Sequence, residues 1–240
     1  MALNKIIDNF IANPSNSREK RDSIVKDLFH GILIGQVECS RCNRVSQTRS
    51  QFSDLSLELP VAQEKSSFLG SIKKFFGDNL PPVTIEECLS HFCKTEGLDE
   101  DEMYFCRFCA KKVAAQKRFF FEKVPRTLVI QLKRFASKRH GHDGHGDMTK
   151  LRNHVAFPAD DLDLSSYLFE NKSGNGEGDG QNEAAKTKNT RYSLSSVVVH
   201  EGDGHSGNYI SYCKNPVTGK WHQMNDRFTK AAKEEDVLSK

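Results

Sequence analysis

Two Cys-x-x-Cys pairs constrain this chain more than any other feature of its sequence. Cys39 and Cys42 form the first pair, Cys106 and Cys109 form the second, and 63 residues lie between the two. A tight turn can present both of its sulfurs on one side, so two such turns can place four thiolates around a single ion. Four sulfurs at about 2.3 Å satisfy tetrahedral Zn²⁺. The sequence therefore predicts a structural zinc site, because four cysteine ligands leave no position open for a substrate.

The alternative fates of these cysteines are disulfides or inert thiols. The chain has seven cysteines in 240 residues, whereas a secreted disulfide scaffold is more often short and carries an even number. The three remaining cysteines, Cys88, Cys93 and Cys213, stand singly in apolar stretches. We expect them to be buried thiols, since a free cysteine packs like a small hydrophobic residue. The tract containing His140, His142 and His145 is a further metal candidate, although such a tract is more typical of a solvated loop.

The charge balance bears on the kind of partner. Lys and Arg number 35 against 32 Asp and Glu, a formal net charge of +3. So small an excess gives no electrostatic reason to expect nucleic acid or an anionic membrane as a partner. The start of the sequence lacks a basic region followed by an apolar one, so we expect no secretory signal and a soluble protein of the cytoplasm, the nucleus or both.

The pattern along the chain mixes helices with many strands. Residues 1–30 read as an amphipathic helical lead-in, and residues 52–59 alternate as a half-buried strand. Thr84 and Glu87 have the spacing of a capping box, which predicts a helix that begins there. Residues 118–124 and 127–135 read as two strands, and the turn between them suggests an antiparallel pair. A further antiparallel pair is expected at 208–214 and 220–224.

Two polar segments interrupt this pattern. Residues 137–147 are rich in Gly and His, and residues 170–190 are rich in Gly and charge. Neither segment can bury enough apolar surface to offset the entropy of ordering it. We therefore expect both to be flexible surface insertions.

Several segments together resemble the ubiquitin-specific proteases, the papain-like cysteine deubiquitinases. The knuckles Val-Glu-Cys-Ser-Arg-Cys and Tyr-Phe-Cys-Arg-Phe-Cys carry part of the match. The segments that match follow the order of the family, namely 28–31, 37–42, 52–60, 84–89, 104–109, 128–135, 155–158 and 192–226. They cover nearly all of the chain outside the two insertions.

The resemblance implies an α+β fold in which an antiparallel β palm sheet carries a zinc-ribbon β extension, the fingers, and a few helices. This is the papain-like cysteine-protease fold without most of its helical thumb. The implied division of residues 1–240 is a helical lead-in over about 1–36, zinc-ribbon fingers with an intervening helix over about 37–118, and the palm over about 119–240. In the family a cysteine thiolate attacks the carbonyl of ubiquitin's C-terminal glycine, a His is the general base, and an Asp or Asn orients that His.

The chain departs from the family at the catalytic positions. The family's Cys box, a Gly-Asn-Thr-Cys-type turn, lies well upstream of the first knuckle, and none of the 38 residues before Cys39 reads that way. The family's Gly-His-Tyr is here Gly-Asn-Tyr, with Asn208 at the position of the His. Asn cannot accept and return a proton near neutral pH. His205 is the alternative base, His200 is expected to end a strand, and Asp226 matches the orienting position or is an ordinary turn residue.

The end of the sequence departs as well. The family adds one more palm strand after Lys240. We therefore expect the palm sheet of this chain to have an exposed edge.

Two functions follow from these observations. The first is a segment of a ubiquitin-specific protease whose parent cleaves ubiquitin from proteins, with ubiquitin or a ubiquitinated protein as the partner. The second is a non-catalytic relative that binds ubiquitin or another partner. In either case we expect this chain alone to be inactive and to bind neither nucleic acid nor membranes. A zinc-ribbon nucleic-acid binder is disfavoured by the near-zero charge.

Overall fold

The computed structural model describes residues 23–60, 81–99, 102–138, 147–170, 189–203 and 206–240, and the following statements concern these residues. None of the helices they form has the length and apolar character needed to cross a bilayer. Most of the predicted lead-in, the His140–His145 tract and His205 lie outside the described residues.

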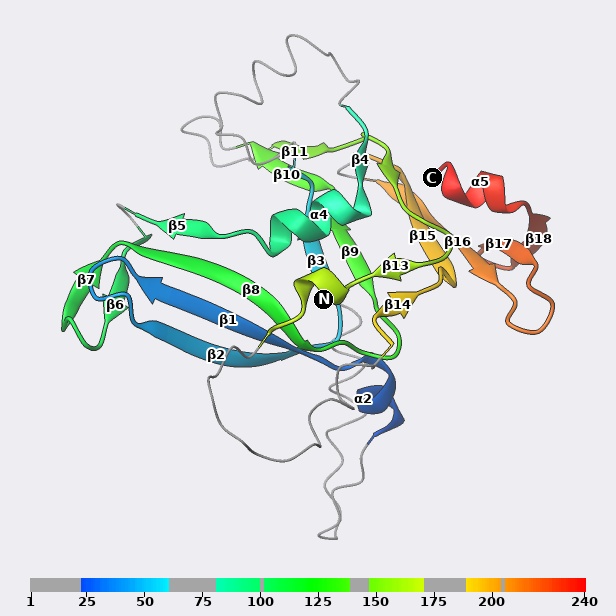
Figure 1. Cartoon of the computed structure of the whole chain (residues 1–240). Helices are drawn as coiled ribbons and strands as arrows, with labels where there is room; N and C mark the ends of the chain where they lie inside the picture. The colour runs from blue at the N-terminus through cyan, green and yellow to red at the C-terminus, as the bar shows by residue number, and fades with distance from the viewer. Residues whose placement is uncertain (1–22, 61–80, 100–101, 139–146, 171–188, 204–205) are drawn as a thin grey trace, which may run out of the picture.

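A long antiparallel sheet forms one end of the molecule (Figure 1). Its strand order is β2-β1-β8-β5, and the strands are β1 (Gly31–Cys39), β2 (Val45–Phe52), β8 (Ala115–Lys123) and β5 (Glu96–Leu98). A small hairpin lies at the outer end of this sheet and consists of β6 (Tyr104–Cys106) and β7 (Lys111–Val113). This arrangement corresponds to the predicted fingers. β1 begins earlier than residue 37, and β8 continues past residue 118 toward the rest of the fold.

The main hydrophobic core lies where this sheet meets α4 (Ile85–Phe92). Two short parallel pairs contribute to it, β3 (Leu55–Glu58) with β9 (Ile130–Lys133) and β4 (Val83–Thr84) with β12 (Val155–Ala156). The predicted alternation is confirmed, since Leu55, Leu57 and Leu59 are at most 2% exposed. The predicted capping box at the start of α4 is also present.

One predicted strand pairing is wrong. Residues 118–124 and 127–135 do not form an antiparallel hairpin, because β8 pairs with β1 and β5 while β9 pairs in parallel with β3. In this arrangement β8 buries apolar side chains against strands that are distant in the sequence. Phe121 on β8 is fully buried and packs edge-on against Phe52.

A second four-stranded antiparallel sheet follows the chain in order, β15-β16-β17-β18. It comprises β15 (Ser196–Gly202), β16 (Gly207–Lys214), β17 (Trp221–Asn225) and β18 (Phe228–Ala232), and α5 (Glu234–Leu238) follows it. The predicted pairing of 208–214 with 220–224 is confirmed. β18 and α5 were not predicted, and they complete a second core around Trp221 and Val237.

The remaining elements are short. They are α2 (Ile24–Phe29), the hairpin of β10 (Phe135–Lys138) and β11 (Asp147–Lys150), the pair β13 (Leu162–Asp163) and β14 (Arg191–Tyr192), and a 3-10 turn at Ser165–Tyr167. β10 and β11 flank the first predicted insertion, so pairing extends into its ends. The middle of each insertion lies outside the described residues.

Candidate functional site

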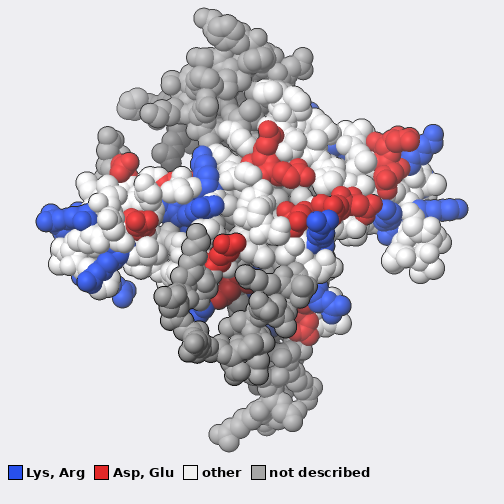
Figure 2. Space-filling view, in the orientation of Figure 1, with Lys and Arg blue, Asp and Glu red and all other residues white. Residues whose placement is uncertain are grey.

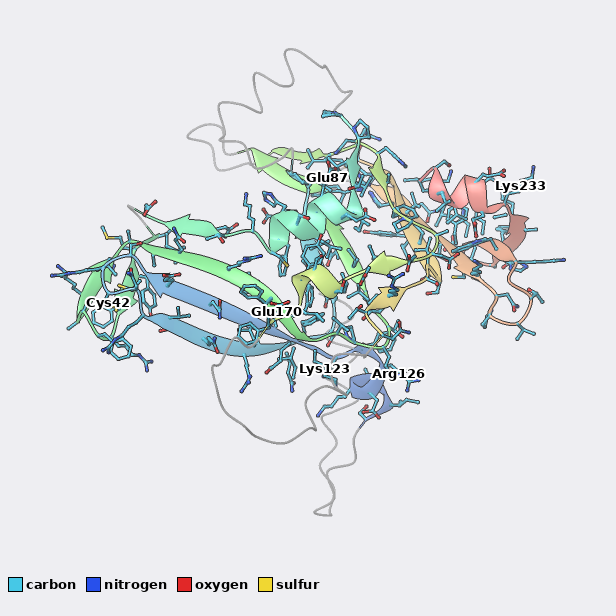
Figure 3. All side chains as sticks on the ribbon, in the orientation of Figure 1. Cys42, Glu87, Lys123, Arg126, Glu170 and Lys233 are labelled. Carbon is cyan, nitrogen blue, oxygen red and sulfur yellow. The ribbon has the colours of Figure 1, made fainter. Side chains whose placement is uncertain are left out.

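The four cysteines of the two Cys-x-x-Cys pairs meet at the outer end of the fingers (Figure 3). Their sulfur atoms all lie within 4.8 Å of one another. The Sγ atoms of Cys39 and Cys109 are 3.9 Å apart, and those of Cys42 and Cys106 are 3.7 Å apart. Sulfurs bound at about 2.3 Å to a tetrahedral zinc ion are about 3.8 Å from each other. The four residues therefore fit zinc, and they fit it with one pair contributed by each knuckle.

The two knuckles are built by local backbone geometry. Asn43 and Ala110 follow the two pairs and both adopt positive φ, 55° and 52°, which turns the chain sharply back into the next strand. Hydrogen bonding from the backbone of Cys42 lowers the pKa of the Cys39 thiol to about 6. The backbone of this knuckle thus favours the thiolate of Cys39, which is the form that binds a metal, whereas burial raises the pKa of the Cys109 thiol in the same cluster.

Basic side chains surround this metal site. Arg41, Arg44, Lys111 and Lys112 are exposed on the knuckles and on β7, and Figure 2 shows lysines and arginines gathered at this end of the molecule. The Arg44 guanidinium lies 4.0 Å from the ring centre of the exposed Phe108. These cations offset the net negative charge that four thiolates and one Zn²⁺ would carry.

The family's catalytic His position lies at the other end of the fold, on β16. Asn208 is exposed there, and its Nδ2 donates a hydrogen bond of 2.9 Å to Oδ1 of Asn225 at the end of β17. Asp226 is the next residue and has a positive φ of 50°, as expected of a turn. Asn208 therefore faces the side-chain amide of Asn225.

His200 lies half-buried beside this position. Its Nδ1 lies 3.2 Å from Nζ of Lys150, which also donates to the carbonyl oxygen of Gly202 at 3.1 Å. The imidazole contacts the rings of Phe135 and Tyr209. Lys150 can donate to Nδ1 in the tautomer that carries its proton on Nε2. His200 lies within β15 instead of ending it.

The prediction of buried thiols is confirmed for two of the three remaining cysteines. Cys88 and Cys93 are at most 3% exposed, and burial raises the pKa of each thiol to about 11. Both are therefore neutral near pH 7 and enclosed by the core. Cys213 lies on β16 and is half-buried, so the prediction of a buried thiol holds only partly there.

Two residues near position 208 were not singled out from the sequence. Asn225 stands directly before Asp226, and the register of β16 and β17 identifies it. Ser211 pairs with Met224, which puts Asn225 beside Ile210. Ile210 is two residues from Asn208. Lys150 carries no sequence signal, because it is distant in the chain from β15.

Comparison with known families and proteins agrees with this geometry. The model of the family "Ubiquitin carboxyl-terminal hydrolase" matches residues 1–240. Ubiquitin carboxyl-terminal hydrolase 2 of Gallus gallus is 34% identical over 209 residues, which are 87% of this chain and 48% of that protein. Ubiquitin carboxyl-terminal hydrolase Usp2 of Drosophila melanogaster is 32% identical over 217 residues, 90% of this chain and 19% of that protein. The chain thus spans about half the length of these relatives or less.

Solved structures give the same result for the fold. The SAGA Ubp8/Sgf11/Sus1/Sgf73 DUB module bound to ubiquitin aldehyde contains a chain that superposes with a TM-score of 0.70 at 26% identity, over 99% of this chain and 45% of that chain. A variant form of the same module bound to monoubiquitin also has a TM-score of 0.70, at 27% identity, over 99% of this chain and 44% of that chain. With the family match over its full length and a cysteine cluster suited to a zinc ribbon, the chain belongs to the ubiquitin carboxyl-terminal hydrolases, as a member of the ubiquitin-specific protease family.

Proposed function

We propose that this chain is the fingers-and-palm part of a ubiquitin-specific protease and that, as it stands, it binds ubiquitin or a ubiquitinated protein without hydrolysing the conjugate. The observation that carries the proposal is the pair formed by Asn208 and Asn225. Asn208 puts a neutral amide where the family needs a base, and it faces Asn225, a residue of a type that the family accepts in the orienting role. An amide cannot take a proton from a thiol near neutral pH.

The cysteines support the same proposal. Four of them form the metal cluster, and a thiolate bound to zinc in a closed site is a structural ligand. Cys88 and Cys93 are buried and their thiols have raised pKa values, whereas an activated nucleophile needs a lowered pKa. In the family the nucleophile belongs to the Cys box, and this sequence contains no such box.

The binding role is supported by what the chain retains. The predicted division assigns residues 37–118 to the fingers and 119–240 to the palm, which are the parts that hold ubiquitin in the family. Structural relatives of this chain are bound to ubiquitin aldehyde and to monoubiquitin. Free thiols in the core and an almost balanced charge fit a protein of the cytoplasm or nucleus.

The experiment uses the zinc-loaded chain and isotope-labelled ubiquitin. We expect shifts of a contiguous set of ubiquitin resonances on titration with the chain, and no release of a fluorophore from a ubiquitin C-terminal amide. Asn208→His is the matched variant, and we expect it to remain inactive because the nucleophile is still missing. Cleavage by the pure chain would refute its inactivity, and unperturbed ubiquitin resonances would refute its binding.

The alternative to a segment of a longer protease is a non-catalytic relative that only binds ubiquitin or another partner. The intact mass of the native protein, measured from its own cells, separates the two cases. A mass well above 27.1 kDa with a Cys box in the added sequence identifies a protease, whose activity Asn208 then limits. A mass equal to that of the chain identifies a protein that only binds.

A further inference from the structure

The four cysteines at the outer end of the fingers are not equally exposed. Cys39 and Cys106 are 0% and 2% exposed, whereas Cys42 and Cys109 are half-buried. Each knuckle therefore has one cysteine that is enclosed and one that is partly open to solvent. The susceptibility of a thiolate to oxidants increases with its exposure. Oxidation of this cluster is therefore expected to begin at the half-buried cysteine of a knuckle.

Two sulfur–sulfur contacts connect the knuckles, and each joins a half-buried cysteine to a buried one. Sγ of Cys42 lies 3.7 Å from Sγ of Cys106, and Sγ of Cys109 lies 3.9 Å from Sγ of Cys39. The sulfurs of a disulfide are about 2.05 Å apart, so each pair has to approach by less than about 2 Å. Every cysteine of the cluster thus has a partner on the other knuckle, and none is left over.

The connection between the knuckles matters because they are distant in the sequence. The two contacts span 64 and 70 residues of the chain. A bridge over so long a segment strongly restricts the unfolded chain, whereas a bridge within one Cys-x-x-Cys pair closes only a very short loop. Bridges between the knuckles would therefore hold the β6–β7 hairpin to the end of β1 without a metal, and bridges within the knuckles would not.

We propose that oxidation by a peroxide replaces the zinc of this chain with two disulfides between the knuckles, Cys42–Cys106 and Cys39–Cys109. A cysteine binds the metal as its thiolate, and a disulfide sulfur has no thiolate to offer. The zinc is therefore released as the bridges form, and the outer end of the fingers stays closed in an oxidised form without metal. This exchange is a redox switch of the fingers, and it does not depend on the proposed binding of ubiquitin.

Each bridge forms in two steps and consumes one peroxide. The Cys42 thiolate attacks a peroxide oxygen, so that an S–O bond forms, the O–O bond breaks and hydroxide leaves. The Cys106 thiolate then attacks the sulfur of Cys42, an S–S bond forms, and a second hydroxide leaves. The two thiolates lose two electrons, the peroxide gains them, and solvent protons convert both hydroxides to water. Cys109 and Cys39 react in the same way with a second peroxide, and a dithiol reverses both bridges by exchange.

Mapping the bridges by mass spectrometry tests their connectivity. The zinc-loaded chain carries Cys213→Ser, because Cys213 is half-buried on the other sheet and would react by itself. On titration with hydrogen peroxide we expect one zinc released per chain, and digestion of the quenched product should give the two bridges between the knuckles. Cys88 and Cys93 are the internal control and should stay reduced, since they are at most 3% exposed. Bridges within the knuckles, release of zinc without bridges, or zinc retained under excess peroxide overturns the proposal.

Hydrogen exchange tests whether the bridges keep the outer end of the fingers closed. The two forms to compare are the oxidised chain without zinc and the reduced chain from which a chelator has removed zinc. We expect amide exchange in β6 and β7 to be slower in the oxidised chain by about tenfold or more, because the bridges close long loops. Exchange in α4 and β3 is the control and should be alike in both forms, since these elements belong to a separate core. Equal exchange of β6 and β7 in the two forms overturns the proposal.

Discussion

Gly207 lies so close to β15 that its lack of a side chain is required by the packing beside Asn208. A Cβ added at this residue would lie 2.2 Å from Nε2 of His200 and 2.5 Å from the carbonyl oxygen of Glu201. The backbone of β15 would have to move, and the imidazole is held in place by Lys150. We expect Gly207→Ala to lower the free energy of unfolding by about 1–3 kcal/mol, measured by denaturant titration. Gly97→Ala is the control and should change it by less than about 0.5 kcal/mol, because its nearest neighbour is the flexible Asp99 side chain.

An imidazole at position 208 can report which residue faces it. In Asn208→His the new ring is expected to lie beside Asn225 and to titrate near the ordinary His pKa. Adding Asn225→Asp should raise that pKa by about 1–3 units, because a carboxylate within about 4–6 Å favours the charged form. Adding Asp226→Asn should leave it nearly unchanged, since Asp226 belongs to the turn. Proton NMR of the ring measures both, and a larger effect of Asp226→Asn would contradict the assignment of Asn225.

At the scale of elements, the outer end of the fingers depends on its metal. Among the described residues, the buried side chains in its hydrophobic cluster are just Cys39, Cys106 and Val113. So small a cluster cannot offset the entropy of ordering two loops and a hairpin. We predict one zinc per chain and, on chelation, loss of amide protection in β6, β7 and both knuckles, measured by hydrogen exchange. Protection in α4 and β3 should persist, since they belong to a separate core. Well-folded knuckles without zinc would contradict the site.

The helix α5 is anchored by an interaction that depends on pH. The Nε1 of Trp221, the single tryptophan of the chain, donates 3.0 Å to Glu234, and Lys214 donates to the same carboxylate at 3.3 Å. These contacts lower the pKa of Glu234 below its ordinary value of 4.5. A lowered carboxyl pKa stabilises the fold above the ordinary value, and that contribution is lost as pH falls through the lowered one. We expect Trp221 fluorescence to titrate below pH 4.5, and Glu234→Gln to remove that titration. A titration unaltered in Glu234→Gln would assign it to another group.

How much of this was predictable depends on whether the signal is local. The metal ligands, the capping box at Thr84 and the hairpin of β16 and β17 follow from short spacings in the sequence, and the structure has all three. The pairing of β8 was mispredicted because its partner, β1, is distant in sequence. Asn225 was missed for a related reason, since only the register of two strands brings it to Asn208. Short spacings can be interpreted from one sequence, whereas the register between strands that are distant in the chain cannot.

Among the residues that the structure describes, two main hydrophobic cores can be distinguished, and polar contacts are among the links between them. One core surrounds Leu57, and the other lies between the β15–β18 sheet and α5. Among the described residues, the links between them include the hydrogen bond from Leu194 N–H to the carbonyl of Ala159 and those from Lys150 and Arg152 to Gly202. Contacts of this kind contribute little net free energy each. The two cores are therefore expected to unfold as separate cooperative units.

Paired core substitutions test this separation. Trp221 reports on the second core through its fluorescence, and circular dichroism reports on the whole molecule. Ile210→Ala should destabilise the fluorescence transition in a denaturant titration, by about 2–5 kcal/mol, and leave the unfolding of the first core in place. Leu57→Ala should act in the opposite way, because that side chain is fully buried in the first core. Val217→Ala, at a side chain that is 90% exposed, should change neither. If both probes move together in both core variants, the two cores form one cooperative unit, and the polar links between them are stronger than their number suggests.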